Sequence, residues 1–323
     1  MAKALMGKPM AEAWLQRDQL DRLYAANWEV VVSAAAPPLS EADYLKDIDG
    51  VTHLFANGTD IVSSSVIRVA TDLKGIFRTG VGFDCVDVEE AKARGIPVCI
   101  TPGANTETVA DMTFALMLGL SRKLLSNHLI LRDGDWSPVG SNNVHGKVLG
   151  IVGMGRIGRA VARRANAFNM QVCAYDPFVK KEELDGMGVD LVELNDLFAT
   201  SDFVTLHLPA SEDIGTIVTT PMLDMMKPSA YLVNTARGAL IDEGALKKAL
   251  ISGSIAGAGL DVFIGEPNPD SELLAMDNVI VSPHVAGITA ETQREVARMC
   301  VDNALAVESG DWPDQVVANG VYS

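Results

Sequence analysis

Four polar residues follow short apolar runs in the second half of the chain, and their types could form a proton-transfer site. Arg237 follows "YLVNTA", Asp261 and Glu266 lie in "GLDVFIGEP", and His284 follows "VIVSP". If these runs are parallel strands, their carboxyl ends meet at one edge of a sheet, where open α/β sheets bind ligands. A histidine moves protons near neutral pH, and a neighbouring glutamate favours the imidazolium. An arginine holds a carboxylate through two charge-assisted hydrogen bonds of about 1.5–3 kcal/mol each.

A glycine pattern typical of dinucleotide binding lies between the apolar run "KVLGIVG" and an amphipathic segment. Its glycines are Gly153, Gly155 and Gly158, in the order GxGxxG. The first permits a tight turn, the second lets the main chain approach a pyrophosphate, and the third lets a helix pack on the strand. The start of that helix offers unpaired N–H groups to the pyrophosphate. The alternative is a plain strand-to-helix turn without a ligand.

An acidic residue lies at the position where a dinucleotide-binding site has a carboxylate for the ribose. The apolar run "MQVCAYD" ends at Asp176, 18 residues after Gly158. We expect this carboxylate to accept hydrogen bonds from the adenosine ribose hydroxyls, and it would repel a 2′-phosphate. NAD is therefore favoured over NADP, although Lys180 and Lys181 leave NADP open.

The rhythm of the sequence predicts the elements that position these residues. Short β-branched runs alternate with longer amphipathic segments, which is typical of parallel sheets covered by helices on both faces. We expect helices in the first hundred residues over "MAEAWLQRDQLDRLYAAN" and "DVEEAKARG", and strands in four runs: "WEVVVSA", "VTHLFANG", "LKGIFRTG" and "IPVCITP". One long helix is expected from Asn105 to about residue 136, and another over 289–310. A second strand series begins at "KVLGIVG" and continues through "MQVCAYD", "VDLVE", "DFVTLHLP", "AYLVNTA", "IAGAGLDVF" and "VIVSPH".

These patterns predict an α/β protein with two doubly wound parallel-sheet domains. The last helix and the tail are expected to return to the first domain. We therefore place a Rossmann NAD-binding domain at 104–291, inserted into a smaller flavodoxin-like substrate domain made of 1–103 plus 292–323.

Composition excludes several classes of partner. The formal net charge is −16 and the pI is about 4.7, so nucleic acid and anionic membrane surfaces are disfavoured. We find no signal peptide and no run of the roughly 20 apolar residues that a membrane span needs. The four cysteines are scattered without metal-ligand spacing. They predict reduced thiols in a cytoplasmic protein, and no metal site.

Several motifs in order give a more specific indication. The segments "RTGVGFD", "GMGRIG", "HLP", "NTARGALIDEGAL", "GLDVFIGEP" and "SPHVAG" make the chain, from roughly Val51 onward, resemble the D-isomer-specific 2-hydroxyacid dehydrogenases. The resemblance implies a two-domain enzyme that uses NAD, forms a homodimer and exchanges hydride with a small 2-keto acid.

The resemblance also implies roles for individual residues. Arg237 would orient the substrate carboxylate and polarise its keto oxygen, His284 would be the general acid and base, and Glu266 its partner. Asp261 would contact the nicotinamide carboxamide. Further contacts with the cofactor would come from Arg156, Ile157, Leu208, Thr235 and Ala236, and the N–H groups near Val81 and Gly82 would grip the substrate carboxylate.

The substrate itself stays open. Arg78 lies where phosphoglycerate dehydrogenases of the family have an arginine near the substrate phosphate, but Asn57 replaces a second cation there. Hydroxypyruvate and glyoxylate fit comparably well, and Arg78 leaves room for a substrate with a second anionic group. Two other classes remain as alternatives: a non-catalytic NAD(H)-sensing protein and a phosphite-oxidising relative. Formate is disfavoured because Glu266 stands where formate dehydrogenases have glutamine.

Overall fold

The computed structural model describes residues 1–15, 17–210, 213–311 and 316–321. It divides into two units, one formed by 1–105 with 288–323 and the other by 106–287. The first unit is thus discontinuous in sequence, and the second is inserted into it. The division falls within four residues of the expected boundaries.

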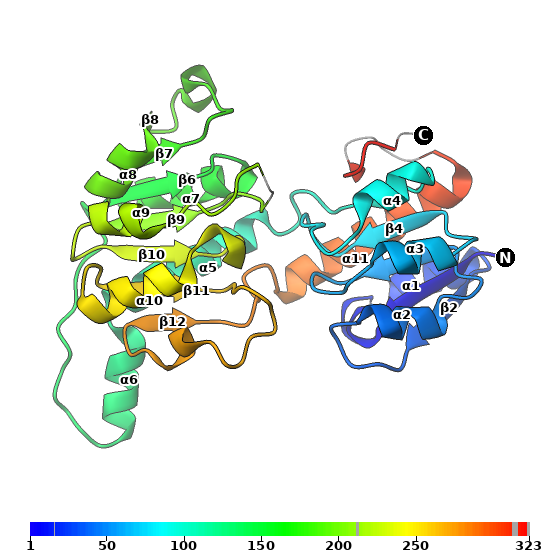
Figure 1. Ribbon diagram of the computed structural model, residues 1–323, viewed down its shortest axis with the longest axis horizontal. Helices are drawn as coiled ribbons and strands as arrows, with labels where there is room; N and C mark the ends of the chain where they lie inside the picture. Colours follow the sequence, from blue (N-terminus) through cyan, green and yellow to red (C-terminus); the bar gives the residue numbers. More distant parts are fainter. Residues whose placement is uncertain (16, 211–212, 312–315, 322–323) are drawn as a thin grey trace. The chain divides into compact units, whose positions relative to one another are not determined.

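The first unit contains a five-stranded parallel sheet in the order β2-β1-β3-β4-β5, the flavodoxin-like order. Figure 1 shows α11 in orange packed on this unit, although it follows the whole second unit in the sequence. The strands are β1 Lys3–Gly7, β2 Glu29–Ser33, β3 His53–Ala56, β4 Gly75–Arg78 and β5 Val98–Cys99. The helices are a π-helical turn at Met10–Trp14, α1 Arg17–Ala25, α2 Glu41–Asp47, α3 Ser64–Val69, α4 Val88–Ala93 and α11 Ala290–Ser309.

The second unit contains a seven-stranded parallel sheet in the order β12-β11-β10-β9-β6-β7-β8, a Rossmann arrangement. Its strands are β6 Val148–Val152, β7 Gln171–Tyr175, β8 Val189–Leu191, β9 Phe203–Leu206, β10 Tyr231–Asn234, β11 Gly257–Leu260 and β12 Val279–Val281. Its α-helices are α5 Thr106–Ser121, α6 Leu124–Arg132, α7 Arg156–Ala167, α8 Leu194–Thr200, α9 Thr220–Met225 and α10 Glu243–Ser252. Short 3₁₀ turns lie at Lys181–Leu184, Gly238–Leu240 and Glu272–Ala275.

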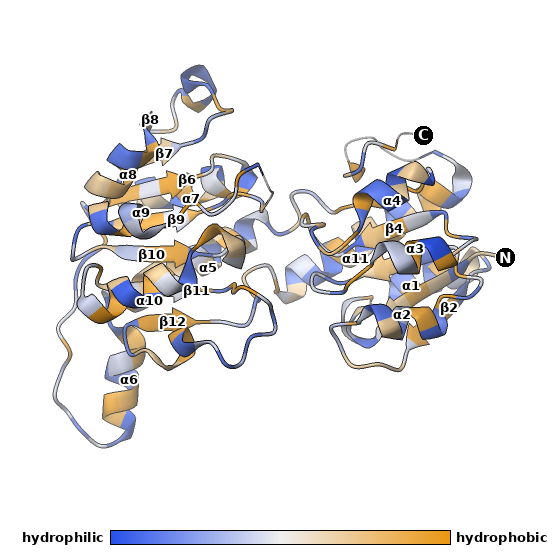
Figure 2. Ribbon diagram, viewed as in Figure 1, coloured by the Kyte–Doolittle hydropathy of each residue, from blue (hydrophilic) through white to orange (hydrophobic). Residues whose placement is uncertain are grey.

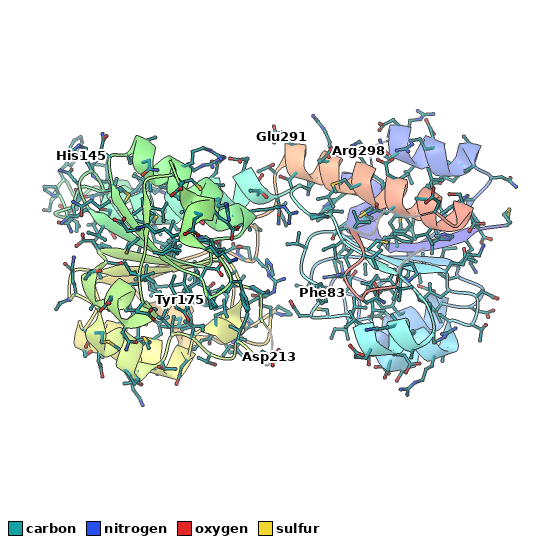
Figure 3. All side chains as sticks on the ribbon, turned by 90° about the horizontal axis from the view of Figure 1, so that it is seen from above. Phe83, His145, Tyr175, Asp213, Glu291 and Arg298 are labelled. Atoms are coloured by element: carbon teal, nitrogen blue, oxygen red, sulfur yellow. The ribbon has the colours of Figure 1, made fainter. Side chains whose placement is uncertain are left out.

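Each sheet lies between two layers of helices, as Figure 3 shows. In the first unit, α1 and α11 cover one face, and α2, α3 and α4 cover the other. In the second unit, α5 and α7 cover one face, and α8, α9 and α10 cover the other. The apolar strands are therefore buried from both sides, which explains their continuous rather than alternating hydrophobicity.

The fold class predicted from the sequence is confirmed, and the differences are local. Strand β1 was not predicted, because "KALMG" is short and rich in good helix formers. Its pairing with β2 on one side and β3 on the other overrides that propensity. The helix predicted over 10–27 is divided into the π-helical turn and α1.

The long helix predicted after Asn105 is also divided. α5 ends at Ser121, and α6 begins at Leu124 after Lys123, whose φ of 49° is left-handed. The two residues between these helices, Arg122 and Lys123, are neither glycine nor proline, and Gly119 lies within α5, so the sequence does not mark where the break falls.

Candidate active site

The polar residues singled out in the second half of the chain lie after three adjacent strands of the second unit. Arg237 follows β10, Asp261 directly follows β11, and His284 follows β12. Glu266 lies in the loop after β11. All four therefore belong to the carboxyl edge of one parallel sheet, as the sequence pattern predicts.

His284 and Glu266 form a close polar pair at this edge. The Nδ1 atom of His284 lies 2.5 Å from Oε2 of Glu266, and Oε1 of Glu266 accepts a hydrogen bond of 2.7 Å from the Phe263 N–H. Burial disfavours the charged form of Glu266, but the His284 hydrogen bond, the Phe263 N–H and the charge of Arg237 outweigh it. The pKa of Glu266 consequently lies below its ordinary value, and its carboxylate is ionised against the imidazole.

Asp261 fixes the main chain that carries His284. Its carbonyl oxygen accepts a 2.7 Å hydrogen bond from the His284 N–H, and His284 adopts a left-handed φ of 52°. Such a backbone is unusual for a non-glycine residue and needs support from its surroundings. The fully buried Asp261 carboxylate supplies it by accepting from Ser282 Oγ at 2.5 Å, Val285 N at 2.9 Å and Ala286 N at 2.8 Å.

These contacts assign Asp261 a positioning role that the sequence did not indicate. Burial raises the pKa of Asp261, and its hydrogen bonds from Ser282, Ala286 and Val285 only partly offset this. Ser282, whose hydroxyl bonds this carboxylate, was likewise missed; a serine two residues before the histidine was the available signal. A contact between Asp261 and the nicotinamide stays a prediction.

Two residues beside Arg237 shape its turn. The buried Asn234 amide donates to the Arg237 carbonyl at 2.8 Å and accepts from the Ala236 N–H at 2.9 Å. Nη1 of Arg237 donates to the Ala236 carbonyl at 2.7 Å. The positive charge of Arg237 helps to lower the pKa of Glu266. The guanidinium therefore interacts electrostatically with the carboxylate that pairs with His284. Asn234 was not anticipated as a site residue.

The glycine loop follows β6, where the order in which strands are added to this parallel sheet reverses: β7 and β8 lie on one side of β6 and β9 to β12 on the other. Gly153 has a φ of 100°, and a Cβ there would lie 2.6 Å from the His207 carbonyl oxygen. A Cβ on Gly158 would lie 2.0 Å from the Gly153 carbonyl oxygen. A Cβ on Gly155 would meet nothing within 4 Å. The first and third glycines are thus required by packing, and the second faces open space, where a pyrophosphate fits.

The residues expected to contact the cofactor lie around this loop. Arg156 and Ile157 begin α7, whose N-cap is Gly155. Asp176 accepts hydrogen bonds from the Met154 N–H at 2.8 Å and the Phe178 N–H at 2.9 Å, so it holds the glycine loop. Three further candidates lie at the carboxyl ends of β9 and β10: Leu208, Thr235 and Ala236.

The substrate-binding candidates of the first unit lie at the carboxyl edge of its own sheet. Arg78 ends β4 and is 2% exposed. Its guanidinium donates to the carbonyls of Asn57, Gly58 and Gly82, the last two at 2.8 and 3.2 Å. Burial lowers the pKa of Arg78. This arrangement argues against the expectation that Arg78 presents a cation to a substrate phosphate, because its donors are directed to main-chain carbonyls. Val81 and Gly82 lie in the half-buried turn after β4.

Two features of the described residues bear on other classes of function. Among the residues that the structure describes, no group of three or more His, Cys, Asp or Glu side chains is arranged to hold a metal ion. Within the same residues, no helix combines the length and apolar character required to cross a bilayer.

Comparison with known proteins decides the family. The D-isomer specific 2-hydroxyacid dehydrogenase, NAD binding domain, matches residues 114–286. A glyoxylate reductase from Korarchaeum cryptofilum is 41% identical over 291 residues, which cover 87% of each chain. The protein belongs to the D-isomer-specific 2-hydroxyacid dehydrogenase family. Members of this family are oxidoreductases, and the matched part of this dehydrogenase is its NAD-binding domain.

Other relatives of this dehydrogenase differ in substrate and cofactor. A D-3-phosphoglycerate dehydrogenase from Methanocaldococcus jannaschii is 39% identical, over 90% of this chain and 56% of its own length. A solved NADPH-dependent glyoxylate/hydroxypyruvate reductase from Sinorhizobium meliloti, in complex with citrate, superposes with a TM-score of 0.84. It is 31% identical, and the match covers 100% of this chain and 99% of that one. The family is therefore established, and its members named above reduce or oxidise different 2-keto and 2-hydroxy acids.

Proposed function

We propose that the protein reversibly reduces a small 2-keto acid to a D-2-hydroxy acid, with His284 as the proton donor. The observation that carries this proposal is the 2.5 Å contact between His284 Nδ1 and the Glu266 carboxylate, next to the charge of Arg237. Because Glu266 engages Nδ1, the other ring nitrogen, Nε2, is the one that gives its proton to the substrate oxygen. In the reverse direction, neutral Nε2 accepts the proton from the hydroxyl group.

Arg237 binds the substrate in this scheme. Its guanidinium holds the carboxylate and polarises the 2-keto oxygen through charge-assisted hydrogen bonds. Fixing the acid in this way is a positioning effect, which lowers the barrier without a covalent intermediate.

The glycine loop would hold the dinucleotide, which supplies the hydride when bound. Gly153, Gly155 and Gly158 admit the pyrophosphate, and the first N–H groups of α7, from Arg156 and Ile157, would bind it. Asp176 would meet the ribose hydroxyls, Asp261 would contact the nicotinamide carboxamide, and Leu208, Thr235 and Ala236 would make further contacts with the cofactor. We propose NAD over NADP because Asp176 would repel a 2′-phosphate. A comparison of kcat/KM for NADH and NADPH tests this; equal values would contradict it.

We also propose that the enzyme is a homodimer through the segment around α6. Figure 2 shows apolar colour on α6, and Leu124, Leu129 and Leu131 are 67%, 49% and 50% exposed. Trp136, which follows this helix, is 84% exposed. Exposed apolar surface of this kind is typical of association surfaces. Sedimentation of the wild type against the Leu129→Asp/Leu131→Asp double variant tests the proposal. A wild type that sediments as a monomer would contradict it.

The catalytic proposal is tested by following NADH oxidation with a panel of acids. The panel contains hydroxypyruvate, glyoxylate, pyruvate, phosphohydroxypyruvate and a branched keto acid. We expect turnover with at least one small 2-keto acid, and a D-configured hydroxy acid as product. NADH binding without turnover on any of them would favour a non-catalytic NAD(H)-sensing protein instead.

A further inference from the structure

Two threonine hydroxyls of the second unit form a buried pair at the carboxyl edge of its sheet. Oγ1 of Thr113, on α5, lies 3.1 Å from Oγ1 of Thr235, which directly follows β10. Thr113 is fully buried, and Thr235 is 8% exposed. The other residues that α5 turns to this face are apolar, among them Ala110, Phe114 and Met117. Polar groups are stable in such a layer only where hydrogen bonds compensate for the lost water, so the direction of these bonds matters.

The proton of each hydroxyl can be assigned from its neighbours. Oγ1 of Thr113 also lies 2.9 Å from the Val109 carbonyl oxygen, which can only accept, so Thr113 donates there. A hydroxyl carries one proton, and Thr113 therefore accepts the bond from Thr235. If Thr113 instead donated to Thr235, the Thr235 proton would have no acceptor among the described residues. The first arrangement uses both protons, and it leaves the lone pairs of Thr235 available to accept.

Packing, rather than the threonine pair, holds α5 at this height on the sheet. A Cβ built on Gly259, within β11, would lie 3.0 Å from Cβ of Leu116, so helix and strand approach closely there. Thr113 lies about one turn of α5 before Leu116, which brings it level with the residue after β10. Replacing the Thr113 hydroxyl by a methyl group should therefore leave α5 in place.

Thr235 lies next to Asp261 at the end of the sheet. Asn234 pairs with Leu260 in the ladder between β10 and β11, and Thr235 and Asp261 directly follow these two residues. The two oxygens of the Asp261 carboxylate already accept three hydrogen bonds from the segment after β12. A carboxamide nitrogen carries two N–H donors. If a carboxamide binds beside Asp261, a second acceptor is required, and the Thr235 hydroxyl is oriented to supply it.

We propose that Thr113 is a positioning residue for the dinucleotide: it holds the Thr235 hydroxyl as an acceptor for an N–H of the nicotinamide carboxamide. This inference rests on the proposed function, which assigns Thr235 and Asp261 to the cofactor. Thr113 touches no part of the cofactor in this scheme and acts only through Thr235. A nicotinamide analogue without the carboxamide nitrogen gains nothing from this arrangement, because it has no hydrogen to donate there.

The test compares the affinity for NADH with that for reduced 3-acetylpyridine adenine dinucleotide, measured by calorimetric titration without a keto acid. This analogue keeps the carbonyl oxygen but has a methyl group in place of the carboxamide nitrogen. Thr113→Val, which is similar in size, should weaken NADH binding by about three- to tenfold and leave the affinity for the analogue within about twofold. Thr113→Ser keeps the hydroxyl and should keep the wild-type preference for NADH.

Thr205→Val is the matched control. Its hydroxyl is buried on β9, the strand next to β10, and has no partner among the described residues. The control should change neither affinity. The double variant Thr113→Val/Thr235→Val should bind NADH no more weakly than Thr235→Val, because Thr113 acts only through Thr235. If Thr113→Val does not fold, Thr235→Val decides, since it should weaken NADH binding and not binding of the analogue.

Three results would overturn the inference. They are wild-type NADH affinity in Thr113→Val, equal weakening of NADH and of the analogue, and additive losses in the double variant. Each of them removes only this inference, because the wild type still binds the dinucleotide. A wild type that binds neither NADH nor NADPH removes the proposed function as well.

Discussion

Gly238 lies against the main chain of Phe263, so closely that a Cβ on Gly238 would fall 2.1 Å from the Phe263 carbonyl carbon. The turn that carries Arg237 and the loop that carries Glu266 are in van der Waals contact at this point. The same loop is held from the other side by Glu243, whose carboxylate accepts from the Ile264 N–H at 2.8 Å. The distance between the Arg237 guanidinium and the Glu266 carboxylate therefore depends on the absence of a side chain at Gly238.

Gly238→Ala is expected to separate these two segments. The added methyl group collides with backbone rather than with a flexible side chain, so the variant should lose about 1–3 kcal/mol of stability. It should also lose at least about tenfold in kcat/KM, because the site geometry is disturbed. Thermal unfolding and steady-state kinetics measure both effects. Gly140→Ala, where a Cβ meets nothing within 4 Å, is the control. Equal behaviour of the two variants would refute the packing argument.

Arg237→Lys is expected to lose roughly 10- to 100-fold in kcat/KM for keto acids, mostly through KM. Lysine keeps the positive charge but cannot hold a carboxylate through two parallel hydrogen bonds. NADH affinity, measured by fluorescence titration, should stay within about twofold, because the predicted partner of Arg237 is the substrate. Arg298→Lys, on the exposed side of α11, serves as the control. Wild-type kcat/KM in Arg237→Lys would remove the guanidinium from substrate binding.

Glu266→Gln is expected to shift the pH dependence of keto acid reduction. Reduction requires the protonated His284 imidazole, so activity is present at low pH and fades as pH rises. The Glu266 carboxylate, whose pKa is lowered by its His284 hydrogen bond against the effect of burial, reciprocally stabilises that protonated form. Without its charge, the activity should fade at a lower pH than in the wild type.

The matched control for this experiment is Glu243→Gln. Its carboxylate binds the same loop through the Ile264 N–H, but no hydrogen bond joins it to His284 in the described structure. It should therefore keep the wild-type midpoint. If both variants give the wild-type pH profile, the pairing of Glu266 with His284 does not control protonation.

Asp261→Asn is expected to lower kcat through the position of His284 rather than through cofactor binding. An amide can replace one acceptor oxygen but not both, so at least one bond to Ser282, Val285 or Ala286 is lost. Ser282→Ala removes one of the same bonds and should change kcat in the same direction, by a smaller factor. Steady-state kinetics and NADH titration distinguish a role of Asp261 in positioning His284 from a role in cofactor binding. A loss of NADH affinity with unchanged kcat would instead favour direct contact with the nicotinamide.

The sequence could indicate the candidate site residues because residues with suitable side chains stand directly after predicted strands. Arg237, Asp261 and His284 each follow an apolar run, so a parallel sheet necessarily gathers them at one edge. The glycine loop could also be predicted from the sequence, because a Cβ at Gly153 or Gly158 would lie within 3 Å of main-chain atoms. Seven strands of the second unit were predicted for the same reason: each is a short apolar run bounded by turn residues.

Other features depend on tertiary contacts that no local pattern contains. β1 is a strand because β2 and β3 pair with it, and the buried Arg78 guanidinium is held by three carbonyls from the turns after β3 and β4. Asn234 and Ser282 support the site through hydrogen bonds whose acceptors and donors are set by the fold. His53 shows the converse: its ring is buried between Trp28 and Phe77, and burial lowers its pKa to about 4, so it belongs to the core.

The central claim is that the His284 imidazole transfers the proton in keto acid reduction. The most direct measurement is the single-turnover rate of NADH oxidation by His284→Asn with the preferred keto acid, alongside NADH affinity and His128→Asn as a control. We predict a loss of at least about 10²-fold in the rate, with NADH affinity unchanged and the control fully active. A His284→Asn enzyme that oxidises NADH at the wild-type rate would contradict the account.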